Sequence, residues 1–346
     1  MSLSKSLILA ALATFAVALV LVRLFCDPGS RLHLLDHPNE RSLHTHPTPR
    51  TGGIAIVIAV ALVLAGGYLT AMISASIGWL VVAALLVAAV SLIDDLRGLA
   101  LRYRLVVHLV VATLLAYTGF QVTGEIWPGG QMAWPEWVSR ILAVLVVVWM
   151  INLYNFMDGM DGFAGGMAVI GFGALAMQGW LTGANEYALI NSVIVAAAGG
   201  FLMFNFPPAR IFMGDTGSAT LGLLAAAMAL WGARDEVLPL WASFLVFSPF
   251  IVDATATLIR RIFRGERFWL AHKTHYYQRL VQMGWGHRKT VLVEYVLMVG
   301  CAVSVLVAVR VTPAVQWGII IFWVVVYAVL MVWVDRMWLR TSARMK

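Results

Sequence analysis

The sequence predicts an all-α, polytopic integral membrane protein with about eleven transmembrane helices. Of its 346 residues, 61% are hydrophobic and only 12% are charged, whereas soluble domains carry roughly 25% charged residues. Long runs contain no charged side chain, and a membrane-crossing helix needs about 20 apolar residues. Backbone amides in a bilayer must be paired within the segment, so these runs are expected to be helices rather than the short alternating strands of a β-barrel.

The charge-free runs define the eleven expected spans. The run Thr51–Ile93 is too long for one helix and is divided around Ser74–Gly78. The other nine runs are Ser6–Val22, Leu105–Gly124, Ile141–Met157, Gly162–Asn185, Tyr187–Ala209, Thr216–Ala233, Val237–Val252, Tyr295–Val309 and Val311–Val334. The first is interpreted as an uncleaved anchor, because no small-residue cleavage site follows it. Residues 1-346 are therefore expected to form one transmembrane domain.

The basic residues predict the orientation. Nineteen of the 24 lysines and arginines fall in the odd-numbered connections and the C-terminal tail, whereas the opposite side holds Lys5, Arg140, Arg234 and Arg310. An excess of Lys and Arg marks the cytoplasmic side, so the N-terminus is expected in the periplasm and the C-terminus in the cytoplasm. The net charge of +7 suits anionic lipids and substrates and gives no reason to expect nucleic acid.

The stretch Asn205–Ser218 reads N-F-P-P-A-R-I-F-M-G-D-T-G-S and connects two apolar runs. It holds Arg210 and, five residues later, Asp215. Small residues and hydroxyls flank this aspartate, so a metal ion or a phosphate can approach it closely. The alternative interpretation of Asp215 is a cap for the helix that follows.

The end of the fifth expected helix carries four polar side chains at a spacing of three. They lie in N-L-Y-N-F-M-D-G-M-D-G and are Asn152, Asn155, Asp158 and Asp161. This spacing keeps them on one helical face. Amide and carboxylate oxygens are the ligands that hard cations prefer, so the line predicts a cation or nucleotide site.

Two further acidic positions lie near helix ends. Asp94 and Asp95 are adjacent, and neighbours on a helix point about 100° apart, so one is expected to face a site while Arg97 or a backbone group holds the other. Asp253 lies within an expected span. It is either functional, as intramembrane acids tend to be, or an acid paired with the nearby Arg260.

Basic side chains are expected to bind phosphate. The connection Arg260–Lys289 centres on H-K-T-H-Y-Y-Q-R-L, and its donors suit a diphosphate, although a membrane-surface amphipathic segment is the alternative. Arg50 lies beside a predicted helix start, where backbone amides favour anions. The expected diphosphate-binding residues are His272, His275, Arg279, Arg210 and Arg50.

Each of these clusters falls at a connection predicted to be cytoplasmic, and the connections are 27-52, 94-104, 153-162, 205-216 and 259-289. Carboxylates gathered on one face repel one another unless a cation compensates. Magnesium suits such a site, because one or two carboxylates plus substrate phosphate oxygens hold it. The pattern therefore favours phosphoryl transfer at the membrane surface.

Four motifs in this order resemble the polyprenyl-phosphate N-acetylhexosamine-1-phosphate transferases of glycosyltransferase family 4: the Asp94-Asp95 pair, N-L-Y-N-F-M-D-G-M-D-G, R-I-F-M-G-D-T-G-S and H-K-T-H. The resemblance runs from about Asp36 to Arg279. It implies that a UDP-N-acetylhexosamine and undecaprenyl phosphate give undecaprenyl-diphospho-sugar and UMP, with Mg²⁺, for which Mn²⁺ can substitute. It also implies a bacterial inner-membrane location with the site facing the cytoplasm, and it leaves a homodimer open.

The resemblance also implies roles for the acidic motifs. Asp215, with Asn155, is then the magnesium ligand. Asp94 or Asp95 is the carboxylate that deprotonates or positions the lipid phosphate. Whether the lipid phosphate attacks directly or an aspartyl intermediate forms is left open.

On the nucleotide side, the resemblance makes Asp161 the uracil contact and places Asp158 and Asn152 in the same motif. His272 and His275 become contacts of the diphosphate or sugar phosphate. Arg50 and Arg210 are added from charge and position alone.

Three features favour the O-antigen-initiating branch over the phospho-N-acetylmuramoyl-pentapeptide transferases of peptidoglycan synthesis. The histidines of the last motif are separated, Arg97 stands where a lysine would follow the acidic pair, and eleven helices are expected rather than ten. The expected sugar is GlcNAc or a 6-deoxy relative such as FucNAc, transferred as its 1-phosphate in lipopolysaccharide O-antigen or related surface polysaccharide biosynthesis. The alternative of another class is an anionic solute transporter, which would place polar groups near mid-membrane.

Overall fold

A computed structural model of the chain describes residues 3–38, 42–69, 73–74, 77–132, 134–266 and 272–345. Its helices are α1 (Leu3–Cys26), α2 (Gly52–Leu69), α3 (Gly78–Arg97), α4 (Leu101–Tyr117), α5 (Glu136–Phe156), α6 (Phe163–Thr182), α7 (Asn185–Asn205), α8 (Gly214–Arg234), α9 (Leu240–Val246), α10 (Ser248–Phe263), α11 (Tyr276–Leu280), the π-helical turn η2 (Val281–Trp285), α12 (Gly286–Ala308) and α13 (Pro313–Met345). Parts of two expected site loops, 39–41 and 267–271, lie outside the described residues, as do the basic residues Arg41, Arg267 and Lys346.

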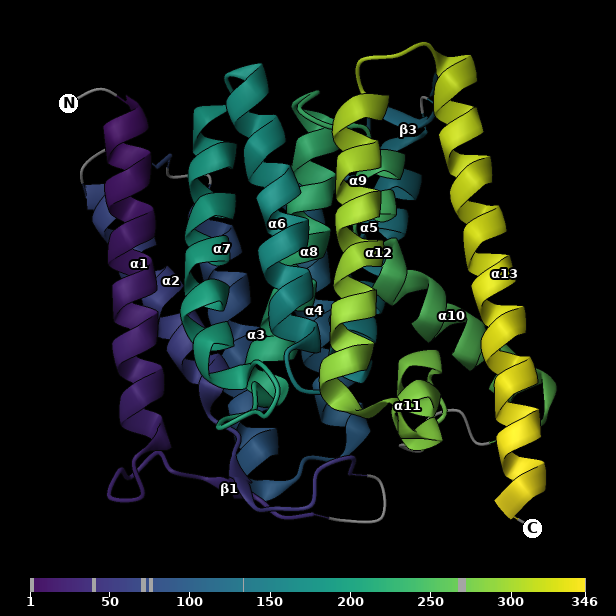
Figure 1. Ribbon diagram of the computed structural model, residues 1–346. Coiled ribbons are helices and arrows are strands. Elements are labelled where there is room, and N and C mark those ends of the chain that lie inside the picture. Colours follow the sequence, from purple (N-terminus) through teal and green to yellow (C-terminus); the bar gives the residue numbers. More distant parts are fainter. Residues whose placement is uncertain are drawn as a thin grey trace.

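The structure confirms an all-α polytopic membrane protein (Figure 1). Among the described residues, nine helices are long and apolar enough to cross a membrane, or ten if α9 and α10, bent by 82° at one residue, form one span. If the bent pair is one span, the expected count of eleven exceeds the observed ten by one helix, α4. This helix has 17 residues and is about 26 Å long, slightly less than the roughly 30 Å of a hydrocarbon core.

Helix α8 lies at the centre of the bundle. Every residue from Thr216 to Ala233 is buried, because this helix is apolar or small on all sides, which is typical of a helix surrounded by others. It packs against α2, α3 and α5. A Cβ at Gly222 would lie 2.5 Å from the carbonyl oxygen of Met150 in α5, so glycine permits this close packing. The start of α8 is therefore held rigidly among the ends of its neighbours.

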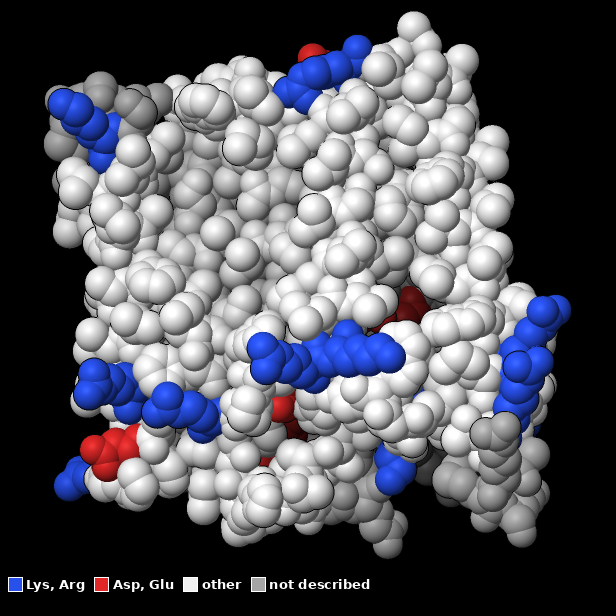
Figure 2. Space-filling view, viewed as in Figure 1, with Lys and Arg blue, Asp and Glu red and all other residues white. Residues whose placement is uncertain are grey.

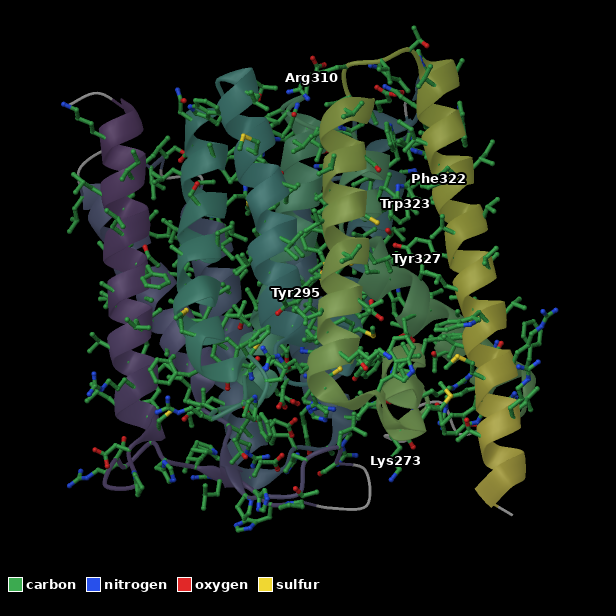
Figure 3. The ribbon with its side chains drawn as sticks, in the orientation of Figure 1. Lys273, Tyr295, Arg310, Phe322, Trp323 and Tyr327 are labelled. Carbon is green, nitrogen blue, oxygen red and sulfur yellow. The ribbon has the colours of Figure 1, made fainter. Side chains whose placement is uncertain are left out.

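Helix α13 is attached through polar contacts with α12 and α10 inside the apolar region. Trp323 and Tyr327 point from α13 toward α12 (Figure 3). The Trp323 indole donates to Ser304 at 3.0 Å, and the Tyr327 hydroxyl lies 2.6 Å from Ser248 Oγ and 3.3 Å from Cys301 Sγ. These bonds satisfy hydroxyl groups that would otherwise be costly to bury.

The two ends of the bundle differ in structure and charge. One end carries the hairpin of β1 (Leu35–Asp36) and β2 (Thr48–Pro49), and the other carries β3 (Glu125–Trp127) and β4 (Gly130–Gln131) (Figure 1). In Figure 2 a broad uncharged band separates the charged groups of the two ends, and most of the visible basic side chains lie toward the β1 end. Helix α1 begins at the β3 end and α13 ends at the β1 end (Figure 1).

Candidate active site

A pocket of about 220 Å³ opens at the β1 end of the bundle. Five aspartates line it, namely Asp36, Asp95, Asp158, Asp161 and Asp215. Six of the residues expected from the sequence therefore meet there, since Asn155 and Arg50 also line the wall with four of these acids. The remaining lining includes His44, Phe212, Gln278 and His287.

The loop before α8 is joined to the start of α2. The Phe212 amide donates to Pro49 O at 2.6 Å, and the amides of Gly52 and Gly53 donate to Phe212 O and Met213 O at 2.9 and 2.8 Å. A Cβ at Gly53 would lie 2.2 Å from the Gly217 nitrogen, so only glycine lets the two helix starts approach this closely. The P-R-T-G-G segment is thus part of the pocket wall.

Asp95 joins the end of α3 to the start of α8. Its carboxylate accepts hydrogen bonds from Thr216 Oγ1 at 2.9 Å, the Thr216 amide at 3.1 Å and the Asp215 amide at 3.3 Å. These amides belong to the first turn of α8, where backbone donors lack partners within the helix and an anion is favoured. Asp95 therefore caps α8 and sets the position of Asp215.

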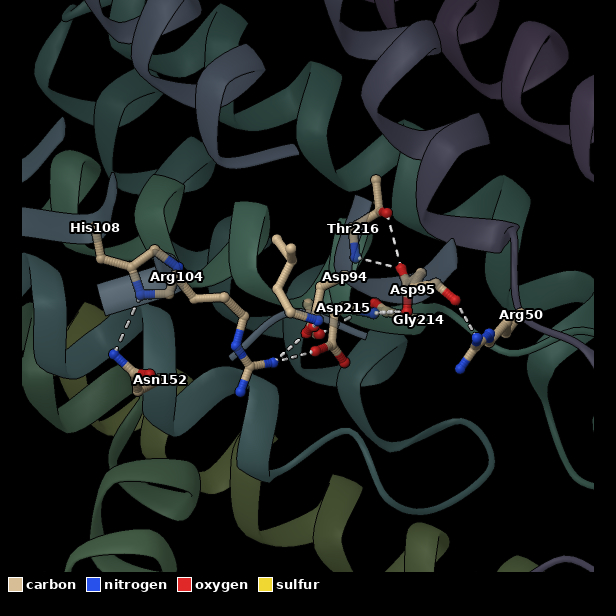
Figure 4. A network of polar contacts seen from close by, with 11 residues as sticks. Arg50, Asp94, Asp95, Arg104, His108, Asn152, Gly214, Asp215 and Thr216 are labelled. Carbon is tan, nitrogen blue, oxygen red and sulfur yellow. Dashed lines mark hydrogen bonds and ion pairs between the residues drawn. The ribbon is translucent and has the colours of Figure 1, made fainter. Parts of the chain in front are cut away.

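Asp94 and Asp215 share one cation, Arg104, from the first turn of α4 (Figure 4). Nη1 of Arg104 donates to Asp94 Oδ2 and, at 2.9 Å, to Asp215 Oδ2. The Leu99 amide also donates to Asp94, at 2.5 Å. Of the two expected partners, Arg97 or a backbone group, it is a backbone amide that bonds Asp94, and the arginine paired with Asp94 is Arg104 instead of Arg97.

Asn155 and Asp158 line the pocket from the last turn of α5 and from just beyond its end. The Asn155 amide hydrogen-bonds to the Asp215 carboxylate, which brings together the two residues expected to bind magnesium. Burial, together with the nearby carboxylates of Asp215, Asp95 and Asp161, raises the pKa of the Asp158 carboxyl well above its usual range. The pocket therefore concentrates negative charge that a cation would relieve.

Asp161 is held from two sides. Its carboxylate lies 3.0 Å from His287 Nδ1, at the start of α12, and accepts the Ala209 amide at 3.0 Å. Gly162, which follows at a φ of +75°, donates to Asn205 Oδ1 at 2.9 Å. These bonds fix Asp161 at the pocket wall beyond the end of the helix.

The structure does not bring Asn152 to the pocket. Helix α5 ends at Phe156, so only the first two of the four polar residues lie on the helix. The Asn152 amide faces α4, 3.5 Å from His108 Nδ1, and donates to Val148 O at 2.7 Å (Figure 4). The expected line of four therefore separates, with three members at the pocket and one behind it.

His275 lies away from the pocket and is bonded to Asp253. The two are 3.1 Å apart, and the amides of Tyr276 and Tyr277 donate to the same carboxylate at 3.0 and 3.1 Å. Asp253 is therefore a paired acid that caps α11, and its partner is His275 rather than Arg260.

His272 stacks on His275, with ring centroids 4.9 Å apart. Burial, followed by the neighbouring His275 and Arg261, lowers the pKa of His272 to about 4. At neutral pH this side chain is uncharged. His272 is not among the described residues that line the pocket, and it could offer a ligand a hydrogen bond but no positive charge.

Two expected anion-binding arginines are engaged elsewhere. Arg279 is buried, donates to Thr274 O and to Asp335 Oδ1 of α13, each at 2.8 Å, and is joined at that aspartate by Arg260. Arg210 is exposed, and its guanidinium lies 5.0 Å from the Phe204 ring centroid. Arg50 does line the pocket, where it donates to the Asp95 carbonyl and lies 3.8 Å from Asp36.

The oxygen donors of Asp215, Asn155 and Asp158 converge on the pocket. Across the described ranges, no group of three or more His, Cys, Asp or Glu side chains is arranged to hold a metal ion. Magnesium is commonly held by one or two carboxylates and completed by substrate phosphates and water. The residues present fit such a substrate-completed ion better than a preformed protein cage.

Sequence reasoning missed Arg104 and His287. Each lies at the start of a helix beside an apolar run and belongs to no dense motif, so its pairing depends on the tertiary contact. Arg104 lies nine residues after Asp95, and its presence in the first turn of the next helix was the one available signal.

The chain is similar to a group of membrane transferases. The model of glycosyl transferase family 4 matches residues 76–233. The chain is 31% identical over 329 residues to the decaprenyl-phosphate N-acetylglucosaminephosphotransferase of Mycobacterium tuberculosis, which covers 85% of this chain and 81% of the relative. It is 29% identical over 305 residues to the probable undecaprenyl-phosphate N-acetylglucosaminyl 1-phosphate transferase of Bacillus subtilis, covering 84% and 82%.

A relative with a different name matches at similar identity. The phospho-N-acetylmuramoyl-pentapeptide-transferase of Halalkalibacterium halodurans is 28% identical over 311 residues, covering 84% of this chain and 93% of the relative.

Proposed function

Because this chain belongs to glycosyl transferase family 4, the polyprenyl-phosphate N-acetylhexosamine-1-phosphate transferases, we propose that it transfers GlcNAc-1-phosphate, or a 6-deoxy relative such as FucNAc-1-phosphate, from a UDP-sugar to undecaprenyl phosphate. The observation that carries the proposal is the pocket in which Asp215, Asn155, Asp158 and Asp161 face one another at one end of the bundle. The product would initiate O-antigen or a related surface polysaccharide.

The reaction requires little from a general base. An oxygen of the lipid phosphate attacks the β-phosphorus of the UDP-sugar, the bond from that phosphorus to the bridging oxygen breaks, and UMP leaves. A phosphate monoester has a second pKa of about 6, so the attacking oxygen is already largely ionised at neutral pH. Asp95 accepts three hydrogen bonds from α8, and Asp94 is paired with Arg104. Both acids therefore serve as positioning groups.

Asp215 and Asn155 would hold Mg²⁺, which supplies charge neutralisation at the transferred phosphoryl group. Asp161, fixed by His287 and the Ala209 amide, would accept the uracil imide N–H. Arg50 is placed to balance charge on the diphosphate. The site is assigned to the cytoplasmic face because most Lys and Arg side chains lie toward this end.

The pentapeptide transferase relative supports a second candidate, in which UDP-MurNAc-pentapeptide is the donor. The helix count no longer argues against it, because the structure does not establish eleven spans. The separated histidines and Arg97 still favour the first proposal.

A panel of donors tests the proposal. Purified protein is mixed with undecaprenyl phosphate, Mg²⁺ and either UDP-GlcNAc, UDP-FucNAc or UDP-MurNAc-pentapeptide, and UMP release is measured with product mass. UMP release with an N-acetylhexosamine donor supports the first proposal. Turnover of the pentapeptide donor alone would replace it with the second, and no UMP release from any donor would contradict both.

A further inference from the structure

Arg104 forms ion pairs with two carboxylates that come from different helices. Its Nη1 atom bonds to Asp94 at the end of α3 and, at 2.9 Å, to Asp215 at the start of α8 (Figure 4). Asp215 is the residue expected to bind the divalent cation. In this structure the arginine therefore occupies one oxygen, Oδ2, of the carboxylate that is expected to bind the metal ion.

The charge of the pocket explains why a cation is required there. Five aspartates line the pocket, and carboxylates this close repel one another. Arg50 lies near Asp36, and His287 is paired with Asp161. In the described part of the chain, the ion pair found for Asp215 is the one with Arg104. Arg104 thus supplies the charge that a bound metal would supply.

The two carboxylates hold Arg104 unequally. The Asp94 side chain is 11% exposed and is fixed further by the Leu99 amide, whereas the Asp215 side chain is 33% exposed and opens on the pocket. The arginine side chain is itself 29% exposed, on a long stem with several rotatable bonds. Asp94 is therefore the anchor, and the bond to Asp215 is the one that can be exchanged.

We propose that Arg104 is a displaceable stand-in for the divalent cation, which holds Asp215 when no metal is bound and retreats to Asp94 alone when the metal arrives. This inference rests on the proposed metal role of Asp215. It makes metal binding an exchange of cations rather than a simple addition. Arg104 should therefore weaken metal binding while stabilising the metal-free protein.

Direct metal binding tests this without turnover. Detergent-solubilised wild-type protein and the variants Arg104→Gln, Arg104→Lys and Arg102→Gln are titrated with Mn²⁺ alone, and free Mn²⁺ is followed by electron paramagnetic resonance. Arg102 is the matched control, because it lies on the same turn of α4 and is exposed, with a hydrogen bond to Tyr103 rather than to the pocket. Midpoints of thermal unfolding are measured in EDTA and in saturating Mn²⁺.

Arg104→Gln should bind Mn²⁺ at least about tenfold more tightly than wild type, because the positive charge that competes for the Asp215 carboxylate is removed. It should also unfold at a lower temperature in EDTA and recover most of the difference in Mn²⁺. Arg104→Lys keeps the charge without the planar fork, so its Mn²⁺ affinity should lie between those of wild type and Arg104→Gln. If the glutamine variant does not fold, the comparison of Arg104→Lys with wild type tests the proposal. Arg102→Gln should match wild type.

Unchanged or weaker Mn²⁺ binding by the Arg104 variants would overturn the inference while leaving the metal site in place. A wild-type protein that binds no Mn²⁺, although it releases UMP, would overturn the metal role of Asp215 and this inference together. Tighter binding by Arg102→Gln as well would reduce the effect to general surface charge and would also overturn it.

Discussion

The carboxylate of Asp95 accepts both the backbone amide and the hydroxyl of Thr216, at 3.1 and 2.9 Å. This pair joins the end of α3 to the start of α8 inside the pocket wall. Because Asp215 precedes Thr216, the position of the proposed metal ligand depends on this contact between two helices.

Removing the hydroxyl with Thr216→Val should destabilise the protein by roughly 1–3 kcal/mol, because a largely buried carboxylate loses a partner. The midpoint of thermal unfolding and the rate of UMP release should both fall. Thr220→Val is the control, since Thr220 lies one turn further along α8 and donates to the Thr216 carbonyl. Equal effects of the two substitutions would contradict a special role for the Asp95–Thr216 pair.

Asp215→Asn should lower UMP release by at least about 100-fold, because a neutral amide is a poorer ligand for a hard cation than a carboxylate. The protein should still be inserted in the membrane. Asp235→Asn, just beyond the opposite end of α8 and paired with Arg234, should keep wild-type turnover. Near-normal turnover by Asp215→Asn would remove this residue from the proposed site.

His287→Ala should raise KM for the UDP-sugar by about tenfold or more, because Asp161 loses a charge-assisted hydrogen bond. A smaller change in kcat is expected, since uracil is bound similarly in the ground state and the transition state. Initial-rate kinetics over a range of UDP-sugar concentrations would measure both constants. Arg288→Ala, at the next and exposed position, is the control, and an unchanged KM for His287→Ala would argue against Asp161 as the uracil contact.

Arg279→Gln tests whether that arginine is a diphosphate ligand or a structural group. Its bond to Asp335 predicts a lower thermal midpoint and a KM within about twofold of wild type. Asp335→Asn should have the same effect, and the double variant should be less than additive, with a coupling of about 0.5–3 kcal/mol. A large rise in KM caused by Arg279→Gln alone would favour the original sequence-based role.

The contribution of His272 to stability should fall as the pH is lowered from about 6.5 toward 4. The pKa of His272 is lowered to about 4 in the folded protein, whereas an unfolded histidine has a pKa of about 6.5. Between these values the unfolded chain binds a proton that the folded chain does not, so acidification favours unfolding. In the His272→Gln variant the midpoint of thermal unfolding should depend less on pH over this window than in wild type. An identical pH dependence in the two proteins would contradict the lowered pKa of His272.

The membrane class, most of the helices and six of the residues that line the pocket could be predicted from the sequence. Composition determines the class, because so many apolar runs of about 20 residues are stable as helices in a membrane and not as the surface of a soluble protein. Asn155, Asp158, Asp161 and Asp215 were found because short-range spacing and flanking glycines carry local information. Arg50 was found from its place beside a helix start.

The partners of these residues depended on tertiary structure. Asp94 pairs with Arg104 rather than Arg97, and His275 is bonded to Asp253 instead of facing the pocket. Sequence spacing does not distinguish the expected partners from the observed ones, because Arg97 and Arg104 carry the same charge and His275 can hydrogen-bond to a carboxylate or to a phosphate. Arg104 reaches both Asp94 and Asp215 because α3 packs against α4 and against α8, whose Gly222 permits close packing in the centre of the bundle.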